Sequence, residues 1–143
     1  MKSKQPGGAG TPATPSTPTK IFSVEDANRT LPLVSRIVQD IVAQHTRWRE
    51  RVARFELSSP PESQLIEREV HELAAEIQSY VQELDQLGIE IKDYTTGLID
   101  FPGELAGRRV WLCWRLGEAA VEYWHELDAG YSGRQRLTPR AVA

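Results

Sequence analysis

The chain has very little cysteine, with Cys113 as the single example among 143 residues. One cysteine cannot form an internal disulfide, so the fold does not depend on an oxidising compartment. The chain also lacks the run of about eighteen apolar residues that a membrane-spanning helix needs. Lys2 and Lys4 are not followed by the apolar segment of a secretion signal. We therefore expect a cytoplasmic protein that does not enter a membrane.

A large excess of charge of either sign is missing too. Lysine and arginine total 17 against 20 acidic residues, which gives a net charge of −3. This balance argues against nucleic acid as a partner. The only glycine-rich segment, residues 7–10, precedes no strand–helix unit, so it does not indicate a phosphate-binding loop. No G-x-S-x-G nucleophile motif is present either.

Residues 1–20 are dominated by glycine, proline, threonine and serine and contain almost nothing to bury. Such a segment cannot offset its ordering entropy, so we expect a disordered tail. Its three Thr-Pro pairs indicate either a solvated linker or a site for phosphorylation or partner binding. Residues 21–137 are predicted to form a single domain, and residues 138–143 a frayed end.

Two long helices are predicted for residues 21–87. Ser23 with Asp26 is typical of a capping box, and Pro32 is expected to end or kink the first helical piece near Leu31. A helix then continues to about residue 55. Two apolar seams with heptad spacing follow. The seam of the first helix is Val34, Val38, Ile41, His45, Trp48, Val52 and Phe55, and that of the second is Ile66, Val70, Leu73, Ile77, Tyr80, Leu84 and Leu87.

The prolines at residues 60–61 break the chain between these helices, and Gly88 suits a helix C-cap. We therefore expect a long antiparallel hairpin over residues 21–87. Residues 89–92, 98–101 and 109–115 have the period of strands, and residues 118–127 that of a short helix. Together these features predict an α+β fold, in which the hairpin packs on a small antiparallel sheet of about three strands with a short C-terminal helix.

Several motifs of the chain occur together in one known family. They are the sequence FSVEDAN at residues 22–28, Leu31 with Pro32, Gly88 with Ile89, Lys92 with Asp93, GLIDFP at residues 97–102, LCW at residues 112–114, Gly117 with Glu118, Trp124 with His125, and Gly130 with Arg134. Over roughly residues 21–137 the chain thus resembles the bacterial domain of unknown function family 2203. The resemblance implies a small soluble bacterial protein with a helical N-terminal half, and it carries over no activity, substrate or cofactor.

Titratable groups gather near the tryptophans of the C-terminal third. Asp100 lies on a predicted strand, and Glu118 and His125 lie on one face of the predicted helix. Two carboxylates and an imidazole suit a divalent iron, zinc or manganese ion. In that hypothesis Arg134 holds an anion, and the wall of the site is formed by Trp111, Trp114 and Trp124. The alternative is structural: Glu118 is a helix-start acid, His125 stacks on Trp124 or donates to a backbone carbonyl, and Asp100 forms an ion pair with Arg108, Arg109 or Arg134.

Other polar residues have a functional and a structural interpretation as well. Cys113 is either a small buried apolar residue or a ligand or reactive thiol. His45 interrupts its seam and is placed level with His71 across the hairpin, where the two histidines would either form a hydrogen bond that sets the register or hold a metal ion as a pair. Arginines at residues 47–54 either bind phosphates or pair with glutamates of the second helix.

Two classes of function follow. Two long seams offer more apolar face than two helices can consume, which indicates a non-catalytic interaction protein that binds a partner or a second copy through the hairpin. The interaction seam is Val38, Ile41, His45, Trp48, Val70, Leu73 and Ile77. The alternative is a metal-binding protein or metal-dependent enzyme built on Asp100, Glu118 and His125.

Overall fold

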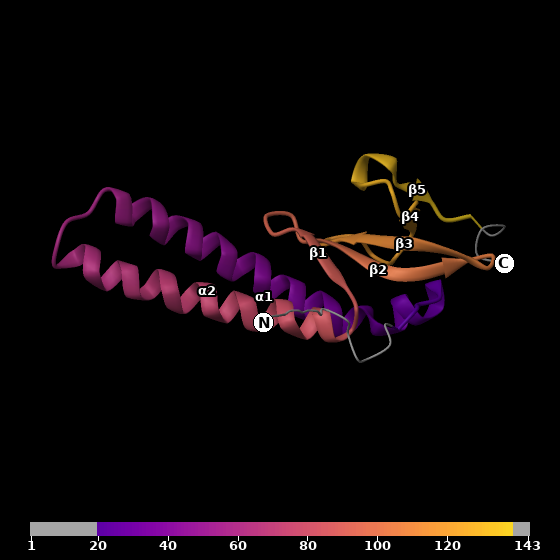
Figure 1. Ribbon diagram of the computed structural model, residues 1–143, viewed down its shortest axis with the longest axis horizontal. Helices are drawn as coiled ribbons and strands as arrows, with labels where there is room; N and C mark the ends of the chain where they lie inside the picture. Colours follow the sequence, from indigo (N-terminus) through magenta and orange to yellow (C-terminus); the bar gives the residue numbers. More distant parts are fainter. Residues whose placement is uncertain (1–19, 139–143) are drawn as a thin grey trace, which may run out of the picture.

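The structure is a computed structural model, and it describes residues 20–138. Helices α1 (Val24–Glu56) and α2 (Glu62–Gln86) form an antiparallel hairpin beside a five-stranded sheet. The strands are β1 (Glu90–Asp93), β2 (Leu98–Leu105), β3 (Arg108–Arg115), β4 (Tyr123–His125) and β5 (Gln135–Arg136). Figure 1 shows the hairpin below the sheet and the segment with the 3-10 turn η2 (Tyr131–Gly133) on the opposite side. The α+β class and the hairpin are thus confirmed.

Helix α1 begins where the capping motif predicts. The Ser23 hydroxyl accepts a hydrogen bond from the Asp26 backbone N–H at 3.0 Å. Of the two effects expected of Pro32, an end of the helix is wrong, because α1 continues through it to Glu56, and a kink remains the prediction. Pro32 is exposed and gives up one backbone hydrogen bond. Its neighbours Leu31 and Val34 are buried, and this packing keeps the helix continuous across the proline.

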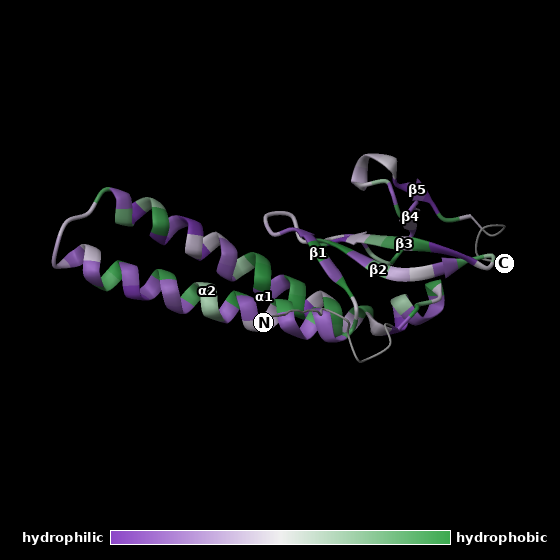
Figure 2. Cartoon of the chain, in the orientation of Figure 1, coloured by the Kyte–Doolittle hydropathy of each residue, from purple (hydrophilic) through white to green (hydrophobic). Residues whose placement is uncertain are grey.

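The hairpin buries its seams unevenly along its length. Every fully buried residue of α1 lies between Ala27 and Ile41, in the half that packs beneath the sheet. Figure 2 shows hydrophobic and hydrophilic residues interspersed along both helices. Beyond Val42 the two helices are joined by their seams and by ion pairs. Arg51 pairs with Glu69 at 2.9 Å and Arg54 with Glu62 at 2.8 Å, as the structural interpretation of the arginines predicts.

The sheet is antiparallel throughout, and its strands follow one another in sequence order. The predicted strand segments are present, but the sheet has five strands where about three were expected. Alternation along the strands gives it two different faces. The face toward the hairpin carries the apolar core, to which Ile99, Phe101, Leu112 and Trp114 belong. The other face carries polar residues and is partly covered by the C-terminal segment.

The helix expected over residues 118–127 is absent, and this part of the prediction is wrong. A loop leads instead into β4, and the short C-terminal helical element is the 3-10 turn Tyr131–Gly133. Donors from other segments of the chain form hydrogen bonds to the backbone carbonyls of this loop. The indole of Trp114 donates to the Glu118 carbonyl at 3.0 Å, and the Leu137 N–H donates to the Glu122 carbonyl at 2.8 Å. These carbonyls would otherwise accept bonds within a helix.

Both ends of the chain lie largely outside the described residues. The tail with its Thr-Pro pairs, apart from Lys20, and residues 139–143 lie outside the described residues. Within the described part of the chain, neither helix is long and apolar enough to cross a membrane.

Candidate functional site

Two of the predicted ligands, Asp100 and His125, meet on the sheet face away from the hairpin. Asp100 comes from β2 and His125 from β4, and each side chain is nearly inaccessible, at 2 % exposure. The His125 Nε2 atom lies 3.1 Å from each carboxylate oxygen of Asp100. These are the two buried residues of polar or charged type among the described residues. A buried pair of this kind needs its hydrogen bonds because isolated charges are costly away from water.

Cys113 completes the cluster from the strand between them. Its backbone is paired with Asp100 on one side, and Trp111, two residues earlier, is paired with His125 on the other. The side chains of Asp100, Cys113 and His125 therefore lie on one face of three adjacent strands. One ligand-type atom from each residue lies within 4.8 Å of the others. We call these three residues the buried triad.

The hydrogen bonds of His125 define where its protons can be. Its Nδ1 atom lies 2.9 Å from the carbonyl oxygen of Glu126, which can only accept, so Nδ1 carries a hydrogen. Nε2 then either accepts from a protonated Asp100 or, as imidazolium, donates to the Asp100 carboxylate. The pair shares one proton in both arrangements. The predicted structural role of His125, donation to a backbone carbonyl, is thus present together with its proximity to Asp100.

Burial also acts on the acidity of the other two groups. It raises the pKa of Asp100, although the neighbouring His125 opposes that rise. Burial, reinforced by the negative charge of Asp100, raises the pKa of the Cys113 thiol to about 12. Cys113 is therefore a neutral thiol at neutral pH, with little of the thiolate that a reactive cysteine needs.

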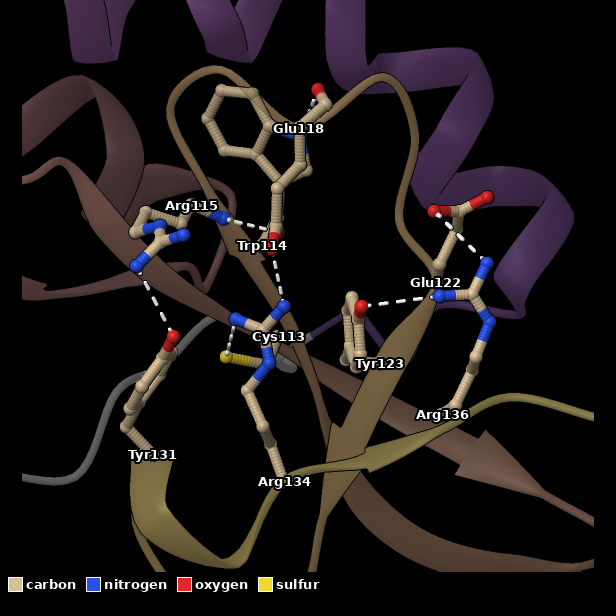
Figure 3. A network of polar contacts seen from close by, with 9 residues as sticks. All are labelled: Cys113, Trp114, Arg115, Glu118, Glu122, Tyr123, Tyr131, Arg134 and Arg136. Atoms are coloured by element: carbon tan, nitrogen blue, oxygen red, sulfur yellow. Dashed lines mark hydrogen bonds and ion pairs between the residues drawn. The ribbon is translucent and has the colours of Figure 1, made fainter.

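Arg134 comes from the C-terminal segment and lies beside Cys113, one member of the triad (Figure 3). Its Nη1 donates toward Cys113 Sγ at 3.8 Å, and its Nη2 forms an ion pair with Glu118. The guanidinium stacks 3.6 Å from the ring centre of Tyr123 and lies 4.8 Å from that of Tyr131. Arg134 is thus bound to protein groups on several sides, with 10 % of its side chain exposed.

The remaining predicted ligand, Glu118, faces Arg134 rather than the triad. Its Oε1 accepts from the Arg115 backbone N–H at 2.9 Å, and its Oε2 pairs with Arg134. Glu118 was placed with His125 by helical spacing, and the helix is absent. The third residue beside Asp100 and His125 is Cys113, which was not among the three predicted metal ligands. The signal was present, because the strand alternation of residues 109–115 puts Cys113 on a different face from Leu112 and Trp114.

The three tryptophans expected to wall the site are divided between the two faces of the sheet. Trp111 shares the face of Cys113 and lines a separate hollow with Pro102 and Leu127. Trp114 and Trp124 belong to the core between sheet and hairpin. Only Trp111 therefore lies on the side of the triad.

The predicted interaction seam lies largely inside the hairpin. Val38, Ile41, Leu73 and Ile77 are buried, whereas His45, Trp48 and Val70 are half-buried.

The expected pairing of His45 with His71 is not what the structure contains. His45 stacks on Trp48, with ring centres 5.8 Å apart, and faces Tyr94 at 5.4 Å, whereas His71 is exposed. The His45 Nδ1 atom is enclosed without a hydrogen-bond partner. These rings, with Ala74 and Ile77, line a shallow apolar hollow of about 220 Å³.

Comparison with known proteins gives one result. The model of the family described as "Uncharacterized conserved protein (DUF2203)" matches residues 20–137. No curated protein and no solved structure matches the chain.

Proposed function

This chain belongs to the DUF2203 family, and from the geometry above we propose that it is a non-catalytic protein that self-associates through the projecting half of its hairpin. We define the projecting half as residues 45–56 of α1 and residues 62–74 of α2. Figure 1 shows this part of the hairpin extending beyond the sheet. The proposal concerns a surface of the helices and is independent of the buried triad.

The observation that carries the proposal is the sparse burial of this part of the molecule, in which the buried residues are Ile66 and Leu73 of α2. No residue of α1 beyond Ile41 is fully buried. Three large apolar side chains gather at the tip, with Phe55 38 %, Leu57 83 % and Leu65 53 % exposed. Helices in water are stabilised mainly by burying an apolar face, so a second surface over this half would add stability.

The charges of the projecting half favour a second copy as the occupant. Its α1 part has four arginines and two glutamates, a net charge of +2, and its α2 part has four glutamates and one arginine, a net charge of −3. Arg49 on α1 and Glu67 on α2 remain exposed. A two-fold axis that places α1 of one copy against α2 of the other brings opposite charges together twice.

The test is the mass of the full chain in solution across the micromolar range, measured by sedimentation equilibrium. We expect a concentration-dependent species of twice the chain mass of 16.1 kDa. Leu65→Glu should weaken the dimer at least about tenfold, because it removes an apolar contact and takes a charged carboxylate out of water. A species that stays at the monomer mass throughout would overturn the proposal.

Leu33 provides the matched control. It is a leucine of similar exposure, at 57 %, near the opposite end of the hairpin. Leu33→Glu adds the same charge and should leave the dimer unchanged. If both variants weaken association equally, the contact lies elsewhere on the molecule and the assignment to the projecting half is wrong.

A further inference from the structure

We propose that Asp100, Cys113 and His125 form a binding site for one divalent cation of the zinc type. The site is distinct from the hairpin surface and does not depend on self-association. It also differs from the ligand set that the sequence suggests, because the thiol of Cys113 replaces the carboxylate of Glu118. The placement of the three side chains, the groups that orient them and their charges all support this site.

The positions of the ligand atoms are close to those required. Around tetrahedral zinc, bonds of about 2.0–2.3 Å keep neighbouring ligand atoms about 3.3–3.6 Å apart. The separation of His125 Nε2 from Asp100 Oδ1 is 3.1 Å, and no pair in the triad exceeds 4.8 Å. Small side-chain rotations therefore suffice to bring all three atoms to one ion. The three residues lie on adjacent paired strands, so their backbones are held in place by the sheet.

The surroundings orient the ligands as metal sites commonly do. A metal-binding histidine usually donates its other ring N–H to a carbonyl or carboxylate, which fixes the tautomer. Here His125 Nδ1 donates to the Glu126 carbonyl at 2.9 Å, which leaves the Nε2 lone pair directed at the triad when the imidazole is neutral. Arg134 Nη1 lies 3.8 Å from Cys113 Sγ, where it can donate to a thiolate. Its own charge is balanced by Glu118.

The charge balance explains why a divalent ion suits this buried place. On binding, the ion replaces two protons, the thiol proton of Cys113 and the proton shared by Asp100 and His125. One carboxylate, one thiolate and a neutral imidazole then carry two negative charges, so a divalent cation makes the cluster neutral. A neutral cluster avoids the large cost of a net charge away from water. The mixture of oxygen, nitrogen and sulfur favours zinc over manganese, which prefers oxygen ligands. Three protein ligands leave a fourth position for water.

Cobalt titration of the full chain tests the proposal directly. The purified protein is stripped with a chelator and titrated with Co²⁺ alone, and absorption is recorded in the near-ultraviolet and visible ranges. We expect saturation at one equivalent, with a thiolate-to-cobalt charge-transfer band and the visible bands of tetrahedral cobalt. Because Cys113 is the only cysteine, that band can come from no other residue. Added zinc should remove it by displacement.

Variants separate the ligands from their neighbours. Cys113→Ala should abolish the charge-transfer band. Loss of a group that hydrogen-bonds to a metal ligand typically weakens metal binding about 10–100-fold. Asp100→Asn removes a ligand itself, so it should weaken cobalt binding by more than that. Glu118→Gln should keep the band, which distinguishes the triad from a site that includes Glu118. His71→Asn, which removes an exposed histidine on α2, should also leave the titration unchanged.

Either result for the wild-type chain decides the question even if a triad variant fails to fold, which circular dichroism would reveal. Absence of a charge-transfer band at excess cobalt overturns the proposal. So does cobalt binding that His71→Asn removes, because the ion would then lie on the surface. Failure here leaves the dimer proposal intact, since self-association does not depend on the ion. A chain that binds cobalt but stays at the monomer mass would overturn only the dimer.

Discussion

At the scale of single residues, Gly103 is where three segments of the core come closest. It lies on β2 opposite Val110 and forms a parallel bridge with Phe22, the residue that precedes the cap of α1. A Cβ atom at this position would lie 2.5 Å from Leu112 Cγ and 3.2 Å from the Phe22 carbonyl oxygen. Leu112 is itself completely buried, so it has no free space into which to move. The absence of a side chain here is thus required by packing.

We expect Gly103→Ala to lower the free energy of unfolding by about 1–3 kcal/mol, the usual cost of overfilling a packed core. Chemical denaturation with urea measures it. Gly130→Ala is the control, because nothing lies within 4 Å of a Cβ atom there and its φ of −115° is open to any residue. That control should stay within about 0.5 kcal/mol of the wild type. Equal stability of all three proteins would show that Leu112 and its neighbours can move to accommodate the added methyl group.

At the scale of elements, the loop before β4 is held to the first turn of α1 by one side chain. The Asn28 Oδ1 atom accepts from the Val121 backbone N–H at 2.7 Å, and its Nδ2 atom donates to the Val121 carbonyl at 3.3 Å. Val121 is buried in the core, so its backbone groups have little access to water. The Asn28 side chain thus forms hydrogen bonds to both the N–H and the carbonyl of Val121, as the backbone of a neighbouring strand would.

Asn28→Ala should destabilise the fold by about 1–3 kcal/mol, because two partly buried backbone groups lose their partner. Thermal or urea unfolding monitored by tryptophan fluorescence gives this value. Ser35 is half-buried on the same helix, and its hydroxyl bonds only to the nearby Pro32 carbonyl at 3.2 Å. Ser35→Ala should therefore alter stability by less than about 0.5 kcal/mol. If Asn28→Ala matches Ser35→Ala, water replaces the amide and the loop does not depend on it.

The turn between β1 and β2 provides a dependence on pH. The Asp93 carboxylate accepts from the Thr95 N–H at 2.8 Å and the Thr96 N–H at 3.3 Å, and these bonds lower its pKa below the usual 3.8. A group with a lowered pKa stabilises the fold above its unfolded-state pKa, and this contribution is lost as the pH falls through the lower, folded-state value.

We therefore expect the wild type to lose this part of its stability as the pH falls below about 4. Asp93→Asn keeps an oxygen acceptor but cannot titrate, so its unfolding free energy should change less with pH in that range. The measurement is urea unfolding at a series of acidic pH values. Parallel profiles for the two proteins would contradict the prediction.

At the scale of the whole molecule, the two halves of the hairpin differ in support. The half below the sheet contributes to the core, whereas the projecting half packs mainly helix on helix, with the ring of Tyr94 against His45 at its base and exposed ion pairs near its tip. Exposed pairs of this kind contribute about 0–1 kcal/mol each. Opening of the projecting half should therefore require less free energy than global unfolding.

Hydrogen exchange should reveal this difference. In dilute solution, the amides of the projecting half are expected to exchange faster than those of residues 27–41. Raising the protein concentration should slow exchange in the projecting half alone, since dimer formation covers it. Leu65→Glu should remove this concentration dependence. Uniform exchange along the hairpin at every concentration would contradict both the local instability and the proposed interface.

Much of the helical half follows from local patterns that the sequence contains. The cap at Ser23, the heptad seams and the break at residues 58–61 depend on near neighbours in the chain, and they predict the hairpin. The strands at β2 and β3 follow from their alternation. The pairing of Arg51 and Arg54 with glutamates follows from bringing the two helices together. These features are decided by interactions over a few residues or across one short loop.

Only the tertiary structure decided the buried triad and the form of the chain around it. Residues 118–127 have an amphipathic helical pattern, but Asn28, Trp114 and Leu137 take their backbone groups and leave a loop and a strand. Without the helix, Glu118 does not lie beside His125. Cys113, from the adjacent strand β3, is instead the third residue of the cluster. The reason is physical: strand pairing joins residues distant in the chain, and competition for backbone hydrogen bonds is settled by packing rather than by local preference.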